Sequence, residues 1–505
     1  MKKLYFSFLT TITFLFTTAQ IVNIPDLEFK TLLTNAVPSD QISSSSIPVY
    51  NSINGNWSVS NYNKIDLNND GEIQLTEAQA VKYLVLEDNS YISNLTGLET
   101  FTNLEYLEFN NNYYIENINF SSLINLKAIR CQGNHELTEI NLGGLTNLIQ
   151  LVCINNELVN LNISSLINLE SVYCSNNNLT ALDATQNGNL KSLDCQINNI
   201  NNLNVSGLIN LEKLKCSNNL LTNLNISSLN NLKILNCEFN QLTNLNVSSN
   251  INLEELFCDN NNLTNLTCNG LSELHVIESF NNQLTSLNLT GLINLQNLLT
   301  FNNQLTSLDL TQNINLNYLI CNDNFLNNIN VIGLNNLATM VCRNNLLTYL
   351  DVSQNPILDI LDCSFNSLIG LQIKNNNATW FNLLFSYNPN LEYVCSDSED
   401  VSLVQQKIID YGYVNCTVDS NCNLINNEFE NSVSLFPNPT KNVLNFKLKQ
   451  NIEVSSIIIY NNLGQVVLVK NNPKEDIDVS TIKTGNYFLK VFTEKGTYTS
   501  KFIKD

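Results

Sequence analysis

The sequence predicts a repeat solenoid, a stack of short parallel β-strands, followed by a small antiparallel β-sandwich. The pattern N-L-x-x-L-x-C-x-x-N occurs at residues 210–219, 231–240 and 252–261. A period of about 20–50 residues is the signature of stacked repeats that bury a shared core. The last Asn of the pattern recurs fifteen times, and ten successive intervals are 21 residues long: Asn89, Asn112, Asn134, Asn156, Asn177, Asn198, Asn219, Asn240, Asn261, Asn282, Asn303, Asn324, Asn345, Asn366 and Asn388.

Each repeat contains one short strand with one buried face. Leu256 and Cys258 alternate with variable residues, and a two-residue period places both on the same side of a strand. The side chain of Asn261, at the following turn, can bond backbone groups that the bend would leave unpaired. The returning segment, LTNLNVS at 242–248 in the preceding repeat, is too short for a long helix. We therefore expect turns, short 3₁₀ pieces or a second short strand on the convex side.

These repeats resemble the bacterial leucine-rich-repeat family, with the pattern L-x-x-L-x-L/C-x-x-N-x-L, and in particular its internalin-like forms with short repeats. The resemblance covers roughly residues 81–395. It implies a leucine-rich-repeat parallel β-sheet and says little about function, because a fold does not fix a function.

The 14 cysteines divide into two groups by position. Ten occupy the inward column of the repeat, where Cys acts as a small buried hydrophobe whose Cβ vector runs parallel to its neighbours', so we expect free thiols. Cys268 takes an inward position of the returning segment. Cys395, Cys416 and Cys422 follow the last repeat. Because disulfides persist in exported proteins, we predict a Cys395–Cys416 bridge, with Cys416–Cys422 as the alternative.

Residues 66–77, DLNNDGEIQLTE, match a calcium-binding loop of the EF-hand type. Gly71 stands at position 6, where this loop turns sharply. Ca²⁺ needs six or more oxygen ligands, and positions 1, 3, 5, 7, 9 and 12 supply them. A structural Ca²⁺ at this loop would clamp the cap formed by residues 20–80 against the first repeat. The six candidate ligands are Asp66, Asn68, Asp70, Glu72, Gln74 and Glu77.

After a cap and linker at residues 396–430, the segment 431–505 changes character. Alternating runs such as NYFLKVF, separated by Gly and Asn turns, predict an antiparallel β-sandwich. F-P-N-P at 436–439, the turn at 460–465 and T-G-x-Y at 484–487 resemble the type A C-terminal sorting domain of type IX secretion. This resemblance implies the type IX machinery as a partner, export across the outer membrane, removal of the tail, and then release or lipopolysaccharide anchoring.

The N-terminal segment and the charge narrow the cellular setting. Residues 1–19 read as a secretory signal peptide, with Lys2 and Lys3 before an apolar stretch and Gln20 as the mature N-terminus. No later run is long enough to span a membrane. The formal net charge of −21 argues against nucleic acid as a partner, because phosphates demand clustered Lys and Arg.

The concave face of the predicted sheet offers a candidate ligand site. Its outward positions lie six, four and two residues before each repeated Asn, and most carry polar residues. One stretch of this face instead carries apolar and aromatic residues, and an exposed apolar patch of this extent marks an interaction site. The patch residues could also cover one another or be covered by the tail. Glu255, Asp259, Glu278 and Arg343 rim the patch. Its members are Phe257, Val276, Phe280, Leu299, Phe301, Tyr318, Ile320 and Val341.

The resulting functional hypothesis is an exported or surface-anchored, non-enzymatic binding or adhesion protein that recognises a protein or a glycan. The only histidines, His135 and His275, are far apart in the sequence, and no nucleophile or metal motif accompanies them. The alternatives are a polysaccharide-active enzyme or its accessory module, and a passive structural surface protein.

Overall fold

A computed structural model describes residues 20–505 apart from 52–55, 88–90, 378–379, 423–432, 449–453, 462–465, 472, 474–475 and 494–495. The predicted signal peptide at 1–19 and the first repeated Asn, Asn89, therefore lie outside the described residues. The chain forms two compact units. The first runs up to Ser367 and includes Trp380–Asn388; the second comprises Leu368–Thr379 and Pro389–Asp505.

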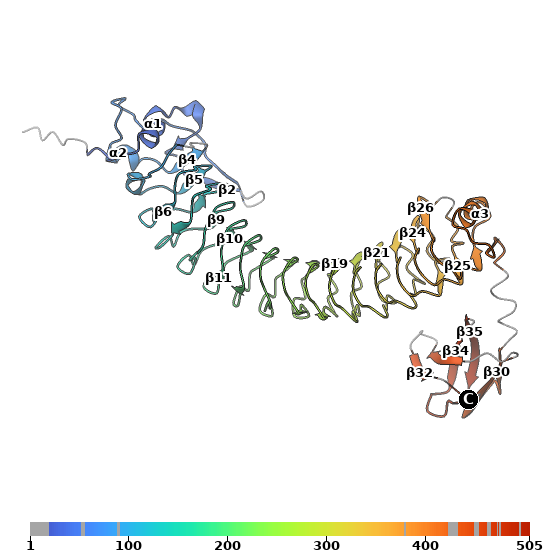
Figure 1. Ribbon diagram of the computed structural model, residues 1–505. Coiled ribbons are helices and arrows are strands. Elements are labelled where there is room, and N and C mark those ends of the chain that lie inside the picture. Colours follow the sequence, from blue (N-terminus) through green and yellow to red (C-terminus); the bar gives the residue numbers. More distant parts are fainter. Residues whose placement is uncertain are drawn as a thin grey trace, which may run out of the picture. The chain divides into compact units, whose positions relative to one another are not determined.

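The first unit is a solenoid built on one sheet, which has sixteen strands among the described residues. Its strands are parallel except for β1, which pairs antiparallel with β4. They follow the inner side of the curve, as β10, β19 and β21 show in Figure 1. The strands are β1 (Ser43–Ser44), β4 (Tyr83–Glu87), β5 (Tyr106–Asn110), β7 (Ala128–Arg130), β9 (Gln150–Val152), β10 (Ser171–Tyr173), β12 (Ser192–Asp194), β14 (Lys213–Lys215), β15 (Ile234–Asn236), β17 (Glu255–Phe257), β19 (Val276–Glu278), β20 (Asn297–Leu299), β21 (Tyr318–Ile320), β22 (Thr339–Val341), β24 (Ile360–Asp362) and β26 (Asn382–Leu384).

The inward columns of this sheet form the core. Leu256 in β17 and Cys258 just after it are fully buried, as the alternation predicts. The cysteines of this column are free and buried, and so is Cys268. Burial raises the pKa of Cys131 to about 12, so these thiols pack as small apolar groups and are poor nucleophiles.

The repeated Asn ties each rung to its neighbours. Nδ2 of Asn240 donates to the carbonyls of Cys216 in the preceding rung (3.0 Å) and of Cys237 and Glu238 in its own (3.2 and 3.1 Å). Its Oδ1 accepts from the N–H of Leu221 (3.0 Å). Asn219 and Asn261 make the same four contacts. The predicted role of this Asn is thus confirmed.

The residue before each repeated Asn adopts a left-handed backbone conformation from Asn155 to Tyr387, with φ between about +49° and +58°. Asn tolerates this conformation, and it fills the position in most rungs. Ile197, Phe239 and Phe365 occupy it as well, although bulky side chains are strained there by roughly 1–3 kcal/mol. The tight turn of the 21-residue rung therefore imposes its geometry regardless of the side chain.

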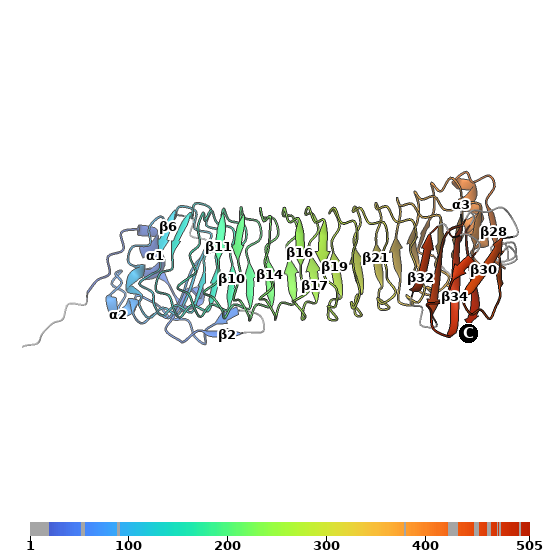
Figure 2. The ribbon, with the colours of Figure 1, turned by 90° about the horizontal axis from the view of Figure 1, so that it is seen from below.

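The convex side carries short second strands in some rungs and turns in the others, two of the options that the sequence left open. The strands pair in parallel, β6 with β8, β11 with β13, and β16 with β18. Figure 2 shows β6, β11 and β16 among the stacked rungs. Their bounds are β6 (Asn117–Asn119), β8 (Glu139–Asn141), β11 (Ala181–Asp183), β13 (Asn202–Asn204), β16 (Asn244–Asn246), β18 (Asn265–Thr267) and β23 (Tyr349–Asp351).

A cap closes the N-terminal end of the solenoid. Helix α1 (Leu27–Asn35) begins after Asp26, whose Oδ1 accepts from the N–H of Phe29 (2.9 Å), and it buries Phe29 and Leu33. Asp26 also accepts from the N–H groups of Ser93 and Asn94 (2.9 and 3.1 Å), which fixes the helix to the loop before the second rung. The other cap elements are η1 (Pro38–Asp40), the antiparallel hairpin of β2 (Val49–Asn51) and β3 (Asn56–Ser58), α2 (Leu75–Ala78) and η2 (Leu98–Thr100).

The second unit begins with β25 (Gly370–Gln372), β27 (Tyr393–Cys395) and β28 (Thr417–Asp419), which pair in parallel, and with α3 (Val401–Asp410). Its disulfide joins Cys395 to Cys422, with Cα atoms 5.3 Å apart, and Cys416 is free. The predicted Cys395–Cys416 bridge and its alternative are therefore wrong. Because β28 lies beside β27 and the chain then turns back, Cys422 and not Cys416 reaches the end of β27.

The tail forms two antiparallel sheets around a core that includes Phe446, Ile459 and Phe502. This arrangement confirms the predicted β-sandwich. One sheet has the order β29-β30-β33 and the other β32-β31-β34-β35. The strands are β29 (Val433–Phe436), β30 (Val443–Leu448), β31 (Val454–Asn461), β32 (Val466–Asn471), β33 (Asp476–Asp478), β34 (Gly485–Thr493) and β35 (Gly496–Lys504).

Replacing Asn240 by Ala should destabilise the solenoid by about 3 kcal/mol, because the buried carbonyls and the Leu221 N–H lose their partner. A lower urea midpoint, followed by circular dichroism, would show it. Asn223 is an exposed Asn of the preceding returning segment and serves as the matched control. Asn223→Ala should leave the midpoint nearly unchanged, and an equal effect of both substitutions would contradict the bonding role.

Candidate binding surface on the concave sheet

The first and third residues of each main-sheet strand face the concave side. In β17, Glu255 and Phe257 are partly exposed while Leu256 between them is buried. Neighbouring strands pair in register, so that Glu255 lies beside Val276 and Phe257 beside Glu278. Equivalent positions of successive rungs therefore form straight columns, spaced by about 4.8 Å. Side chains on this face therefore have their nearest neighbours in the same column, at equivalent positions of successive rungs.

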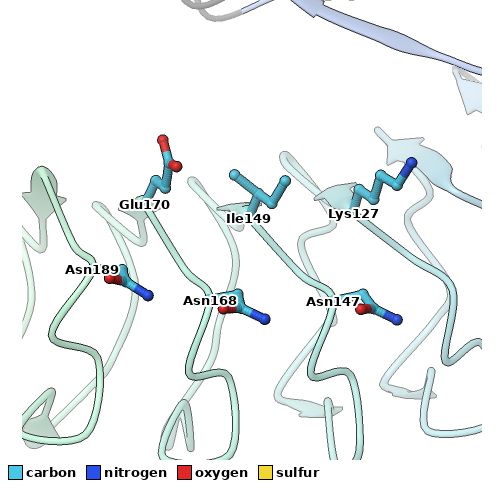
Figure 3. Close-up of a pocket in the computed structure, with 6 residues that line it drawn as sticks. All are labelled: Lys127, Asn147, Ile149, Asn168, Glu170 and Asn189. Atoms are coloured by element: carbon cyan, nitrogen blue, oxygen red, sulfur yellow. The ribbon is translucent and has the colours of Figure 1, made fainter.

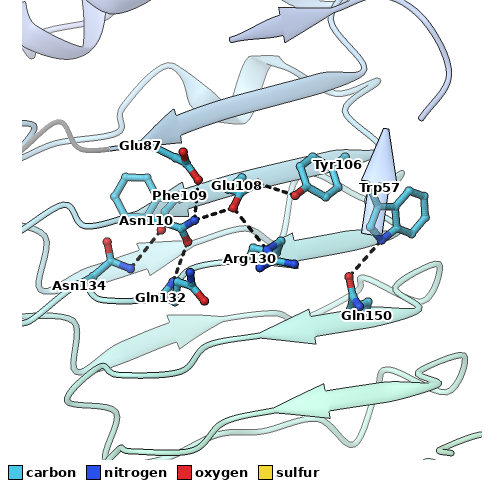
Figure 4. A network of polar contacts seen from close by, with 10 residues as sticks. All are labelled: Trp57, Glu87, Tyr106, Glu108, Phe109, Asn110, Arg130, Gln132, Asn134 and Gln150. Carbon is cyan, nitrogen blue, oxygen red and sulfur yellow. Dashed lines mark hydrogen bonds and ion pairs between the residues drawn. The ribbon is translucent and has the colours of Figure 1, made fainter. Parts of the chain in front are cut away.

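The N-terminal end of the concave face is covered by the cap. Nε1 of Trp57, in β3, donates to Oε1 of Gln150 in β9 (3.1 Å), and the Trp57 ring lies 6.0 Å from that of Tyr106. Tyr106 in turn stacks on Tyr83 at 4.6 Å. Figure 4 shows Trp57 reaching over this part of the sheet. These aromatic residues of the first rungs are therefore core residues.

A polar network continues from this cluster. The hydroxyl of Tyr106 donates to Glu108 (2.6 Å), which also pairs with Nε of Arg130 (3.3 Å) and accepts from Asn110 (2.6 Å). Figure 4 shows these side chains joined across β5 and β7. Burial, together with the bond to Glu108, raises the pKa of Tyr106. The Tyr106 hydroxyl, the Asn110 amide and the Glu108 carboxylate thus have their partners within the protein.

Charges alternate along the edge where the chain enters the main strands. Glu105 pairs with Lys127 (2.6 Å), Glu170 with Lys191 (2.8 Å), and Glu212 with Lys233 (3.2 Å). Ile149 interrupts the alternation between Lys127 and Glu170. A shallow cavity of about 420 Å³ lies at this break, above a row of Asn side chains (Figure 3). The cavity-lining residues are Lys127, Asn147, Ile149, Asn168, Glu170 and Asn189.

The apolar patch predicted from the sequence lies on five neighbouring strands of the main sheet, β17 and β19 to β22, and on residues that follow β19 and β20. All its members are partly exposed, and Tyr318 is the most open, with 38% of its surface exposed. The rings of Phe280 and Phe301 stack, with centroids 4.4 Å apart and planes 7° from parallel. The patch is therefore a ladder of side chains that partly cover each other and still present apolar surface. The members are Phe257, Val276, Phe280, Leu299, Phe301, Tyr318, Ile320 and Val341.

The predicted rim of the patch is not uniform. Arg343 is exposed, and Glu255 lies 3.8 Å from His275. Asp259 is only 1% exposed, and its Oδ1 has no hydrogen-bond partner, while its Oδ2 accepts from Nδ2 of Asn260 (2.6 Å). Burial, and then the charges of Glu238 and Glu278, raise the pKa of Asp259 to about 6. The sequence analysis predicted Asp259 at the exposed rim of the patch, whereas the structure buries it.

The predicted calcium loop is held together by hydrogen bonds. Both oxygens of Asp66 accept from loop N–H groups, of Asn69 (2.7 Å) and Gly71 (3.0 Å). Glu77 accepts from the N–H groups of Leu67 (2.8 Å) and Gln74 (2.9 Å). Both carboxylates are buried. The two ends of the loop are thereby brought together.

The middle of the loop gathers amide and carboxylate oxygens. Nδ2 of Asn68 donates to Asp70 (2.9 Å) and to Gln74 (3.1 Å), while Glu72 turns away to Lys30 (2.6 Å). Position 7 of such a loop binds through its backbone carbonyl, so the turned side chain fits a calcium loop. Within the described ranges, no three Asp, Glu, His or Cys side chains are grouped as a metal cluster. Calcium binding thus stays a prediction.

The two histidines do not meet in the structure. His135 stacks on Tyr113, with centroids 5.2 Å apart and planes 5° from parallel, and His275 lies beside Glu255. Both positions are surface features of different rungs.

Comparison with known proteins supports the two parts of the chain separately. Residues 434–505 match the family model of the secretion system C-terminal sorting domain. The tail is therefore a sorting domain of type IX secretion, and the chain is exported to the cell surface or the extracellular space. No curated protein matches the chain. In the part of the chain that the structure describes, we find no helix that is both long enough and apolar enough to cross a membrane.

Solved structures similar to the chain include internalins and a leucine-rich effector protein. The functional domain of InlJ from Listeria monocytogenes, described as including a cysteine ladder, aligns with a TM-score of 0.55 and 24% identity, over 86% of this chain and 93% of that one. The internalin InlF of the same species gives 0.48 and 23%, over 66% and 94%. YopM from Yersinia pestis gives 0.45 and 23%, over 64% and 78%. The InlJ alignment confirms the leucine-rich-repeat fold.

Asp259→Asn should raise the melting temperature at pH 7.5 by roughly 2–4 °C, and this gain should shrink at pH 5. The pKa of Asp259 is about 6 in the fold against 3.8 for an unperturbed carboxyl, because burial and the charges of Glu238 and Glu278 oppose ionisation. The penalty is complete above pH 6 and declines progressively as the pH falls from 6 to about 3.8, below which the carboxyl is protonated in both states. Thermal melts at the two pH values test this, and an equal gain at both would contradict it.

Proposed function

We propose that this chain is an exported, non-enzymatic binding module that recognises a protein partner through the apolar patch of its concave sheet. The observation that carries the proposal is the stacked pair Phe280 and Phe301, set among partly exposed apolar residues on consecutive strands. Rigid aromatic side chains at the centre of an interface contribute most of the binding energy in many complexes. The cap leaves this part of the sheet uncovered, whereas over the first rungs its Trp57 packs on Tyr106 of β5.

The setting in which the module acts follows from the sorting domain. We also propose that the tail is removed on export and that the mature chain is then held on lipopolysaccharide or released. A surface-held solenoid would present its concave sheet to proteins outside the cell. A glycan partner is the alternative, because aromatic faces also suit sugar rings.

The double variant Phe280→Ser with Phe301→Ser should lose ligand binding while keeping the solenoid folded, because both side chains point out of the core. A library of random 12-residue peptides displayed on phage, panned on the mature protein, supplies the ligands. Clones selected on the native protein should bind the variant at least tenfold less well. Circular dichroism should show an unchanged strand content.

A matched control and a glycan array complete this test. Ile332→Ser with Ile357→Ser removes two exposed apolar residues outside the patch, and it should leave clone binding unchanged. Binding that survives Phe280→Ser with Phe301→Ser would overturn the patch as the ligand site. Glycan binding that needs Phe280 and Phe301, in the absence of peptide clones, would replace the protein partner by a glycan.

We also propose that the loop 66–77 binds one structural Ca²⁺ through Asp66, Asn68, Asp70, Gln74, Glu77 and the backbone carbonyl of Glu72. The meeting of the Asn68 amide, the Asp70 carboxylate and the Gln74 amide in the middle of the loop supports this proposal. Isolated extracellular sites are weak, with Kd of about 10⁻⁴ to 10⁻³ M. The ion would hold the two ends of the loop and thereby the N-terminal cap.

Adding 10 mM Ca²⁺ should raise the melting temperature by a few degrees, since saturation tenfold above Kd adds about 1.4 kcal/mol. Asp66→Ala with Asp70→Ala should remove this rise. Mg²⁺ at the same concentration, which demands a stricter geometry, should have a smaller effect. An equal rise in the double variant would rule out this loop as the source.

A further inference from the structure

Three carboxylates lie beside the stacked phenylalanines. Glu238 and Asp259 occupy the same column in consecutive rungs, two residues before Asn240 and Asn261, and Phe280 is the next member of that column. Glu278 stands one column away, in β19, which pairs in register with β17. Successive members of a column are about 4.8 Å apart. The fold therefore places three like charges on three consecutive rungs, in two adjacent columns of the concave face.

The central carboxylate of this cluster lacks a counter-charge. Asp259 is 99% buried, its Oδ1 has no hydrogen-bond partner, and Oδ2 is bonded only to the Asn260 amide. Among the ion pairs of the described residues, none involves Glu238, Asp259 or Glu278. A buried carboxylate oxygen without a partner costs stability, and in native structures such a group calls for an explanation. A cation bound nearby from outside the chain would supply the missing counter-charge.

The surroundings of these carboxylates favour an organic cation over a metal ion as the ligand. These three carboxylates are not grouped closely enough to hold a metal ion by themselves. Glu238 and Glu278 are partly exposed, so a charged group can reach them from the concave side. A guanidinium offers five donors in a planar fork and can bridge carboxylates that stand apart. The adjacent Phe280 ring can take the apolar stem of such a side chain and attract its charge.

We propose that Glu238, Asp259 and Glu278 form a receptor for one cationic side chain, arginine or lysine, of a protein partner whose neighbouring apolar residue packs on Phe280 and Phe301. This inference rests on the proposed function of the patch and names the chemistry of its partner. Glu238 and Glu278 contact the cation, and Asp259 acts as a positioning charge beneath them. Burial and mutual repulsion raise the pKa values of Asp259 and Glu278, so a bound cation relieves a cost built into the fold.

The first test uses the displayed peptide library at pH 7.5, where Asp259 is ionised. It is panned on the mature protein, on Glu238→Gln with Glu278→Gln, and on the control Asp194→Asn with Glu212→Gln. The control removes two charges from other rungs, so it accounts for non-specific attraction of cations to an acidic protein. Clones from the native protein and from the control should carry at least threefold more Arg and Lys than the input. This excess should vanish on Glu238→Gln with Glu278→Gln, and its persistence there would overturn the inference.

The second test uses the strongest clone as a synthetic peptide, with its cationic residue as arginine or as citrulline, an uncharged isostere. On the native protein, citrulline should weaken binding at least tenfold, measured by isothermal titration calorimetry. On Glu238→Gln with Glu278→Gln the two peptides should bind within about threefold of each other, and on Asp259→Asn the preference for arginine should be reduced because the positioning charge is gone. Equal binding of both peptides to the native protein would overturn the receptor.

The two proposals fail in different ways. Clones that need Phe280 and Phe301 but show no preference for a cation would overturn the receptor and leave the proposed binding function standing. Clones that prefer a cation through Glu238 and Glu278 but ignore Phe280 and Phe301 would instead overturn the apolar patch as the ligand site. Binding of glycans alone would overturn both.

Discussion

The structure depends on one interaction, the hydrogen bonds from a buried Asn side chain to backbone groups of two successive rungs. A 21-residue rung turns too sharply for its own backbone to pair every N–H and C=O group, and unpaired groups inside a protein are costly. Asn240 serves three carbonyls and one N–H at once. A second set of Asn side chains also bonds the backbone of neighbouring rungs. Asn210 and Asn231, at the start of the repeat pattern, donate to carbonyls of the preceding rung. The abundance of Asn in this chain is thus a structural requirement.

Because these bonds fix one register along the stack, the concave face becomes a grid of columns. Residues 21 apart in the sequence lie about 4.8 Å apart in space, so short-range chemistry arises from periodic sequence positions. The stacked rings of Phe280 and Phe301 and the alternating charges from Glu105 to Lys233 both follow from this grid. The same grid forces Glu238 next to Asp259, although neither takes part in an ion pair among the residues that the structure describes.

The two ends of the main sheet differ because the cap covers only the first rungs. The hairpin of β2 and β3 lays Trp57 over the first rungs and turns their aromatic residues into core. The later rungs keep partly exposed apolar residues beside unbalanced carboxylates. An exported solenoid that retains both features against its own stability is suited to a partner that carries an apolar residue and a cation side by side.

The sequence by itself determined the period, the strand positions, the buried column of free cysteines and the sorting domain, because each depends on residues that repeat or match locally. Only the tertiary structure decided which cysteine meets Cys395, since the return of β28 beside β27 brings Cys422 there. It also decided that Trp57 covers Gln150, 93 residues away, and that Asp259 is buried and not at an exposed rim. These outcomes depend on how neighbouring rungs and the cap pack, and packing between distant segments leaves no mark in a local pattern.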